Sequence, residues 1–232
     1  MSVEAAQPLP LRFDAGNPPF MSEQQGVAVG FYPLLLEAAA RRAGVAVELR
    51  AMPWVRVVRE VDDGLSCAVG VYSTPARRSR WAFSEPFFKD QILVLGLPGR
   101  ELPPVREVKD LVGLRVGVVR GWAYGELQEK VERLDRLEST YDDQLFQSLQ
   151  AGKSDVVLAL QHAAQHTLER LGMEARILAV LAEQDVHIAC PKRAPFVPQM
   201  QRLSQVLRVW KRDGTMARMA GQSLGPAVKP SR

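Results

Sequence analysis

The sequence lacks most of the features that mark enzymes, metal proteins and membrane proteins. Its 232 residues include two cysteines, which form no metal-binding or redox spacing. No apolar run approaches the roughly 20 residues that a transmembrane helix requires. It also contains no phosphate-binding glycine loop, nucleophile elbow or H-E-x-x-H zinc motif. These absences exclude the common nucleotide-binding and hydrolytic classes, and no residue stands out as catalytic.

Positive charge is in slight excess but is not concentrated. The net charge is +4, and the densest basic run is Arg77–Arg80. A nucleic-acid-binding protein usually shows a basic stripe or a recognisable motif, and neither is present. We therefore expect no nucleic-acid partner. A basic surface attracts anionic solutes, although weakly at physiological salt.

The few histidines and cysteines give no cofactor site. His162 and His166 stand four residues apart, but no cysteine or carboxylate shares their helix face, so we interpret them as solvent-exposed side chains. We expect no metal and no cofactor.

Cys67 and Cys190 both fall in apolar segments that we predict to be buried strands. Two packed thiols are the preferred interpretation, and a disulfide is the alternative that an oxidising compartment would permit.

Apolar strands alternate with amphipathic helices along the whole chain. This order is typical of βαβ units, in which parallel strands are covered by helices. The predicted strands cover residues 9–14, 45–50, 67–72, 87–97, 111–119, 155–160, 175–180 and 186–190. The predicted helices cover residues 31–43, 54–62, 124–133, 142–151, 163–171, 198–212 and 215–222. The fold class is therefore α/β.

The most informative stretch is Gly64–Phe88. It reads as an apolar strand that stops at a turn containing Thr74, presents Arg77, and turns again at Ser84–Pro86. An arginine at the carboxyl end of a buried strand suits planar, two-point capture of a carboxylate.

This stretch resembles the corresponding region of bacterial periplasmic solute-binding proteins of the amino-acid-binding family (family 3, type II periplasmic binding protein fold). There the pattern is Gly-x-x-Asp, an apolar strand, Thr-Pro-x-Arg, and then Phe-Ser-x-Pro followed by Phe or Tyr. Other motifs of the family follow in the usual order, namely Asn17–Phe20, Met52–Trp54, Asp110–Gly121, Ala151–Asp155 and Lys211–Thr215. Each motif is weak alone, but their order and spacing across the whole chain are specific.

The resemblance implies two lobes, each a mostly parallel sheet flanked by helices, joined by two crossing hinge strands. Residues 1–94 and 190–232 would form lobe 1, and residues 95–189 would form lobe 2. It also implies a periplasmic monomer that binds a small carboxylate ligand and works with an inner-membrane ABC permease. The amino terminus lacks a secretory signal, which fits either a cytoplasmic protein or a mature secreted one; the resemblance favours the second.

The resemblance also places candidate ligand-binding residues. Arg77 matches the position of the family's arginine that binds the ligand's α-carboxylate. Trp54 matches a family position that often forms an apolar or aromatic wall of the side-chain pocket. Tyr72 matches a family position whose neighbourhood contacts the ligand. Trp122 and Ala123 replace two hydroxyl residues of the family, so backbone N–H groups remain there but the side-chain hydroxyls do not.

One departure concerns the ligand's ammonium group. The family places an acidic residue five positions after the Gly-x-x-Asp aspartate, and counting from Asp155 reaches Leu160. A buried ammonium without a counter-charge costs on the order of several kcal/mol. Three hypotheses remain: a carboxylate ligand without an ammonium; an ammonium bound by Asp14, Asn17 or Gln161; or a cleft that serves a partner protein.

We expect a binding protein rather than an enzyme. The alternative enzyme is a periplasmic dehydratase of the cyclohexadienyl type, which needs a carboxyl of raised pKa beside the substrate. Asp14 and Glu85 are the candidates for that role. A third alternative is the ligand-sensing domain of a signalling receptor.

Overall fold

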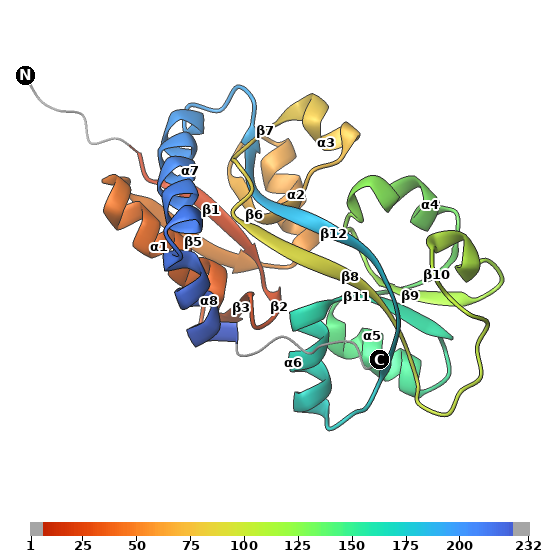
Figure 1. Cartoon of the computed structure of the whole chain (residues 1–232). Helices are drawn as coiled ribbons and strands as arrows, with labels where there is room; N and C mark the ends of the chain where they lie inside the picture. Colours follow the sequence, from red (N-terminus) through yellow and green to blue (C-terminus); the bar gives the residue numbers. More distant parts are fainter. Residues whose placement is uncertain (1–6, 225–232) are drawn as a thin grey trace, which may run out of the picture.

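A computed structural model describes residues 7–224 of the chain, in which two groups of elements are joined by two long strands, β8 and β12 (Figure 1). The prediction about a secretory signal concerns the amino terminus, and its first six residues lie outside the described range. None of the described helices is long and apolar enough to cross a membrane.

Twelve strands and eight α-helices make up the described chain. The strands are β1 (Leu9–Asp14), β2 (Gly16–Asn17), β3 (Met21–Gln24), β4 (Val27–Val29), β5 (Val47–Met52), β6 (Cys67–Tyr72), β7 (Trp81–Phe83), β8 (Phe88–Gly96), β9 (Arg115–Val119), β10 (Asp135–Ser139), β11 (Val156–Leu160) and β12 (Arg176–Pro191). The helices are α1 (Phe31–Ala43), α2 (Trp54–Asp62), α3 (Pro75–Arg80), α4 (Gln128–Glu132), α5 (Asp142–Gln150), α6 (Gln161–Leu171), α7 (Val197–Arg212) and α8 (Thr215–Leu224), with 3-10 turns η1 (Val108–Leu111) and η2 (Gly125–Leu127).

The main sheet confirms the α/β prediction and the type II topology. Its strand order is β10-β9-β11-β8-β12-β6-β1-β5, and β7 pairs with β12. The pairs β5–β1, β1–β6, β11–β9 and β9–β10 are parallel, whereas β8 and β12 run antiparallel to their neighbours. The strands β2, β3 and β4 form a separate small sheet that the sequence analysis did not predict.

The strand β12 corrects one prediction. We expected separate strands over residues 175–180 and 186–190, but a single strand spans Arg176–Pro191. The polar stretch Glu183–Asp185 interrupts the apolar pattern, yet it continues to pair with residues 89–91 of β8. Hydrogen bonding to β8, rather than burial, holds this middle part, so hydropathy alone could not reveal it.

We call lobe 1 the elements β1–β7, α1–α3, α7 and α8, and lobe 2 the elements β9–β11 and α4–α6. The helices α7 and α8 pack against α1, so the described part of the chain returns to lobe 1 after β12 (Figure 1). The expected lobe boundaries, at residues 94/95 and 189/190, both fall inside the crossing strands. This division of the chain stays a prediction.

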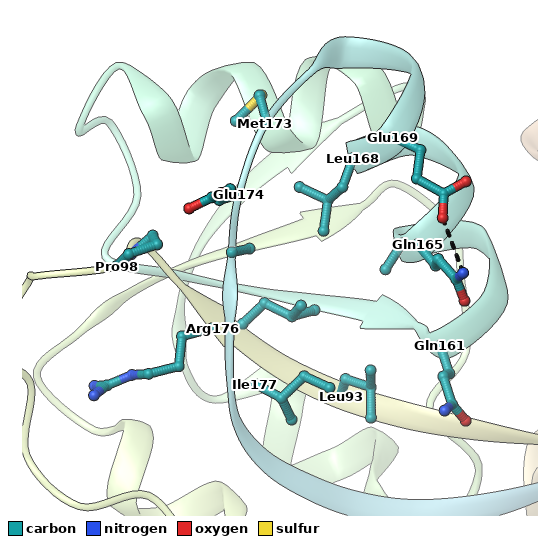
Figure 2. A pocket seen from close by; sticks show the side chains of 13 residues that line it. Leu93, Pro98, Gln161, Gln165, Leu168, Glu169, Met173, Glu174, Arg176 and Ile177 are labelled. Atoms are coloured by element: carbon teal, nitrogen blue, oxygen red, sulfur yellow. Dashed lines mark hydrogen bonds between the residues drawn. The ribbon is translucent and has the colours of Figure 1, made fainter. Parts of the chain in front are cut away.

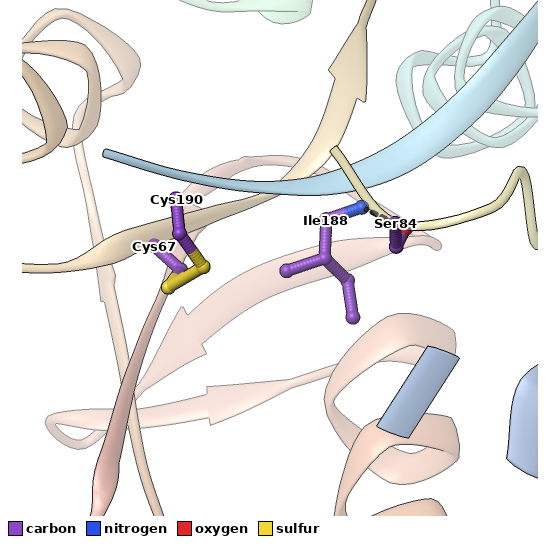
Figure 3. The surroundings of a disulfide bond; sticks show 4 residues. All are labelled: Cys67, Ser84, Ile188 and Cys190. Carbon is purple, nitrogen blue, oxygen red and sulfur yellow. Dashed lines mark hydrogen bonds between the residues drawn. A yellow bond between two sulfur atoms is a disulfide. The ribbon is translucent and has the colours of Figure 1, made fainter. Parts of the chain in front are cut away.

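A buried disulfide joins Cys67 of β6 to Cys190 of β12 (Figure 3). The preferred interpretation of two packed thiols is therefore wrong, and the alternative is correct. The two residues lie on adjacent antiparallel strands with their Cα atoms 4.2 Å apart, although 123 positions separate them in sequence. A disulfide is typical of proteins outside the reducing cytoplasm.

Candidate functional site

A small cavity lies between the two lobes. Its walls contain seven of the eight residues predicted to bind ligand: Asp14, Asn17, Trp54, Tyr72, Arg77, Trp122 and Ala123. Met21, Gly70 and Leu160 complete the lining. The structure thus brings together residues that are up to 146 positions apart in sequence, from Asp14 to Leu160. That these residues bind a ligand stays a prediction.

The topology explains why these side chains meet. Asp14, Tyr72 and Leu160 are the last residues of β1, β6 and β11, and Trp122 follows the end of β9. In open α/β sheets the carboxyl ends of parallel strands are where ligand sites form. The side chain of Trp54, the first residue of α2, enters from the same edge.

The first turn of α3 positions Arg77 in the cavity wall. Thr74 caps α3, because its Oγ1 accepts a hydrogen bond from the Arg77 backbone N–H at 3.2 Å. The guanidinium donates from Nη1 to the Tyr72 carbonyl at 3.1 Å and lies 5.7 and 5.3 Å from the ring centres of Trp54 and Trp81.

The Arg77 side chain is a buried cation that forms no salt bridge, although the negative charge of Asp62 acts on it. The residue is only 8% exposed, and no carboxylate in residues 7–224 forms a salt bridge with it. Burial lowers the pKa of Arg77 to about 10, so it remains charged at neutral pH. Two tryptophan faces stabilise the charge, and its remaining N–H groups can receive an anion.

Two indoles connect the lobes across the cavity. Trp54 of lobe 1 donates from Nε1 to the Gly121 carbonyl at 2.9 Å, and Trp122 donates from Nε1 to Asp14 Oδ2 at 3.1 Å. A Cβ atom on Gly16 of lobe 1 would collide with the ring of Tyr141, which follows β10. The contacts of these side chains therefore limit how closely the two lobes can approach each other.

The cavity that remains measures about 20 Å³. A single water needs roughly 10–15 Å³ on this scale, whereas sites for small organic ligands usually measure a few hundred. The conformation is therefore closed. A ligand larger than water requires either separation of the lobes or displacement of Trp122.

The protein buries three carboxyl groups, those of Asp14, Asp90 and Asp142, of which Asp14 lines the interlobe cavity. Burial raises the pKa of Asp14 to about 6, and it raises the pKa of Asp90, in the middle of the molecule on β8, to about 7. Burial and the nearby charge of Asp14 raise the pKa of Asp142, the first residue of α5, to about 8. Neither Asp90 nor Asp142 was predicted to be buried. An aspartate at a helix start, such as Asp142, normally indicates a solvent-exposed first turn, and nothing in the local pattern around Asp90 signals its burial.

Because these carboxyl groups are buried, we expect the folded protein to be more stable at acidic than at alkaline pH. In the unfolded chain an aspartate titrates near 3.9, whereas the folded protein resists ionisation of Asp14, Asp90 and Asp142 until about pH 6, 7 and 8. Their contribution is therefore fully present below about pH 4 and is lost as the pH rises through 6–8. We expect the ligand-free melting temperature to fall by at least about 4–8 °C between pH 5 and 8.5, for a loss of at least about 2 kcal/mol.

Differential scanning calorimetry across that range measures the profile. The Asp142→Asn variant should flatten it most, because Asp142 titrates highest. Asp110→Asn, at an exposed carboxyl that accepts backbone hydrogen bonds near η1, is the control and should leave the slope above pH 5 unchanged. A flat wild-type profile would contradict the burial of the three groups.

Gln161, the eighth predicted residue, does not line the interlobe cavity. Its side chain lies in an open groove of about 410 Å³ beside α6 and β12 (Figure 2). Hydrophobic side chains such as Leu93, Leu168 and Ile177 contribute much of this groove. The groove is larger than the interlobe cavity, but its charged residues, Glu169, Glu174 and Arg176, are solvent-exposed. The cavity between the lobes is therefore the better candidate site.

Two further predicted side chains lie elsewhere than expected. Glu85 is exposed and pairs with Arg208 at 3.1 Å, so it is not a carboxyl of the cavity. His162 is half-buried beside Phe20, with ring centres 5.6 Å apart, rather than solvent-exposed. Within the described residues no three potential metal ligands come together.

The two lobes, the crossing strands and the cavity between the lobes define a binding protein of the type II periplasmic fold. The chain belongs to the bacterial extracellular solute-binding proteins, family 3, which it matches over residues 10–225. It is therefore a solute-binding protein, and its family is one of binding proteins rather than enzymes. No curated protein matches the sequence significantly.

Solved structures share the fold at low sequence identity. A histidine kinase sensor domain with similarity to periplasmic binding proteins is 19% identical with a TM-score of 0.82, and the match covers 97% of this chain and 98% of that one. The arginine-, lysine- and histidine-binding protein ArtJ from the thermophilic bacterium Geobacillus stearothermophilus is 21% identical with a TM-score of 0.79, covering 96% and 97%. The ancestral amino-acid-binding protein AncCDT-1, a precursor of cyclohexadienyl dehydratase, is 20% identical with a TM-score of 0.76, covering 93% and 94%.

Proposed function

We propose that this protein is a periplasmic solute-binding protein whose lobes close over a small carboxylate-bearing ligand, which it delivers to an inner-membrane ABC permease. The observation that carries the proposal is the buried guanidinium of Arg77, which lines the interlobe cavity and forms no salt bridge with a described carboxylate. A buried cation in that state is complementary to a carboxylate, and a planar guanidinium can bind both of its oxygens.

Closure is part of the proposed function. The cavity is too small for an organic ligand, and of the two ways to enlarge it we expect opening of the lobes about β8 and β12. Two adjacent crossing strands can act as a hinge that permits opening and still keeps the lobes in register. We expect residues 1–94 with 190–232 and residues 95–189 to move as the two bodies, and the protein to work as a monomer.

A thermal-shift screen tests the proposal. The screen pairs amino acids with their deaminated acids, for example L-alanine with propanoate, L-phenylalanine with 3-phenylpropanoate and L-arginine with 5-guanidinopentanoate. A ligand at a hundred times its Kd should stabilise the protein by about 2.7 kcal/mol and raise the melting temperature by about 5–10 °C. Recovery of the ligand unaltered would separate a binding protein from a dehydratase. If no carboxylate shifts the melting temperature, the proposal fails.

A sensory role is the second candidate. The histidine kinase sensor domain is similar over 97% of this chain, which favours a ligand-sensing domain as the alternative. Immunoblotting of cell fractions from the source bacterium distinguishes the two. A periplasmic polypeptide of about the 25.7 kDa of this chain supports transport, whereas a much larger membrane-bound polypeptide supports sensing.

A further inference from the structure

The most basic part of the protein is the segment that returns to lobe 1 after β12. Residues 192–218 contain seven lysine and arginine side chains and one acid, Asp213, so this segment has a formal charge of +6. The whole chain carries +4, so all its other residues together carry −2. The sequence shows no continuous basic run here, because the charges are distributed along the helices α7 and α8, which lie on the outside of lobe 1 (Figure 1).

Most of these charges are exposed and have no acidic partner. Arg208 pairs with Glu85, whereas the other six basic residues form no salt bridge within residues 7–224. These six are Lys192, Arg193, Arg202, Lys211, Arg212 and Arg218, and each of them is exposed. Arg42, in the last turn of α1, is also exposed and forms no salt bridge with a described residue. The outside of lobe 1 therefore presents a positively charged surface.

The outward face of α7 is partly apolar. Leu203 and Leu207 belong to its buried face, which packs on lobe 1. Val209 lies on the opposite side of the helix and is 55% exposed, with Val206 and Trp210 half-buried beside it. A surface helix normally has polar residues on the side that faces away from the core. The apolar side chains on this side therefore suggest that α7 contacts something outside the chain.

Two adjoining hollows lie along this face of α7. The first, of about 290 Å³, lies between the end of α1 and α7, and its wall contains Arg42 and Arg202 together with Val206, Val209 and Trp210. The second, of about 340 Å³, shares Arg202. A guanidinium can bind two oxygens of a phosphate group. Two arginines and an apolar strip in one hollow are therefore complementary to a phosphate that is attached to an apolar body.

We propose that this face, which we call the α7 surface and define as Arg42, Arg202, Val206, Val209 and Trp210, docks the protein on an anionic phospholipid membrane. Headgroup phosphates bind at the two arginines, and the indole lies at the headgroup level, where tryptophan is favoured. The other basic residues of 192–218 add attraction to the charged bilayer surface. Charge spread over two helices matches the wide array of charges on a bilayer better than it matches a single soluble anion or one acidic protein segment. This inference goes beyond the proposed function, because it needs no ligand in the interlobe cavity.

Co-sedimentation of the whole chain with lipid vesicles tests the α7 surface. Measurement in about 0.1 M salt limits the contribution of charges more than about 10 Å from the lipid. The protein should bind vesicles of equal parts phosphatidylglycerol and phosphatidylcholine at least about tenfold more tightly than vesicles of phosphatidylcholine alone. The double variant of Arg42→Glu and Arg202→Glu should bind the anionic vesicles at least about 25-fold more weakly, since each basic group at an anionic surface contributes about fivefold.

A charge-matched control separates the α7 surface from net charge alone. The double variant of Arg106→Glu and Lys153→Glu changes two exposed residues that follow β8 and α5, and it lowers the formal charge from +4 to 0, as the first double variant does. It should bind the anionic vesicles within about threefold of the wild type, because these distant charges are screened. Thermal unfolding shows that both double variants are folded.

Tryptophan fluorescence gives an independent measurement of the contact. Anionic vesicles should shift the emission of the wild type to the blue, and Trp210→Phe should remove most of that shift while keeping the binding. Trp54 and Trp122 lie at the interlobe cavity, and Trp81 is 2% exposed, so these three should contribute little.

Several results would overturn the inference. They are equal binding to both kinds of vesicle, unchanged binding in the Arg42 and Arg202 double variant, an equal loss in the control, and a blue shift that persists in Trp210→Phe. Binding of poly-L-glutamate without binding of anionic vesicles also overturns it and assigns the α7 surface to an acidic protein partner instead.

Discussion

Replacement of Arg77 by alanine is expected to weaken the binding of the carboxylate ligand by about 2–5 kcal/mol, or roughly 30- to 4,000-fold. The reason is that truncation leaves the ligand's charge desolvated in a cavity where no other cation lines the wall. Calorimetry with the tightest carboxylate from the paired screen measures the loss.

Two further variants separate charge from geometry. Arg77→Lys keeps the charge but cannot form two parallel hydrogen bonds, so we expect an intermediate affinity. Arg59→Ala removes an exposed arginine of α2 and should bind like the wild type. Thermal unfolding checks the fold, since Arg77 also packs between Trp54 and Trp81. Unchanged affinity in a folded Arg77→Ala variant would show that the clamp is assigned to the wrong residue.

Removal of the disulfide should have the second large effect. A cross-link that closes a loop of more than a hundred residues restricts the unfolded chain strongly, and the loss of such a bond typically costs about 2–5 kcal/mol. We expect the double variant of Cys67→Ala and Cys190→Ala to melt about 5–15 °C below the oxidised wild type. Calorimetric unfolding at one pH measures the difference.

The reduced wild-type protein is the control for this experiment. Reduction in denaturant followed by refolding with reductant keeps both cysteines but breaks the bond, so the reduced protein should resemble the alanine variant in stability. If the oxidised and reduced proteins melt together, Cys67 and Cys190 contribute only as packed thiols. Mass spectrometry after alkylation of the unfolded protein counts free thiols and decides whether the bond was present.

The paired cysteines illustrate what local sequence cannot supply. Both segments are apolar and were correctly predicted as buried strands, because hydropathy reports burial. Whether two buried cysteines meet depends on the register of β6 against β12, which is set by pairing across 123 residues. The same reason explains β12, whose polar middle is held by its partner β8 and not by its own pattern.

The α/β class, the two-lobed family fold and seven of the residues that line the cavity could be predicted from the sequence, because motif order and the ends of apolar strands fix which side chains reach the cleft. Packing of the whole chain sets the pairing of the cysteines, the hydrogen bonds of the Trp54 and Trp122 indoles between the lobes, and the burial of Asp142. Those features depend on the closeness of groups from separate strand ends, and distance in space is set by packing of the whole chain. A single aspartate at a helix start has the same local sequence pattern whether it is exposed or buried.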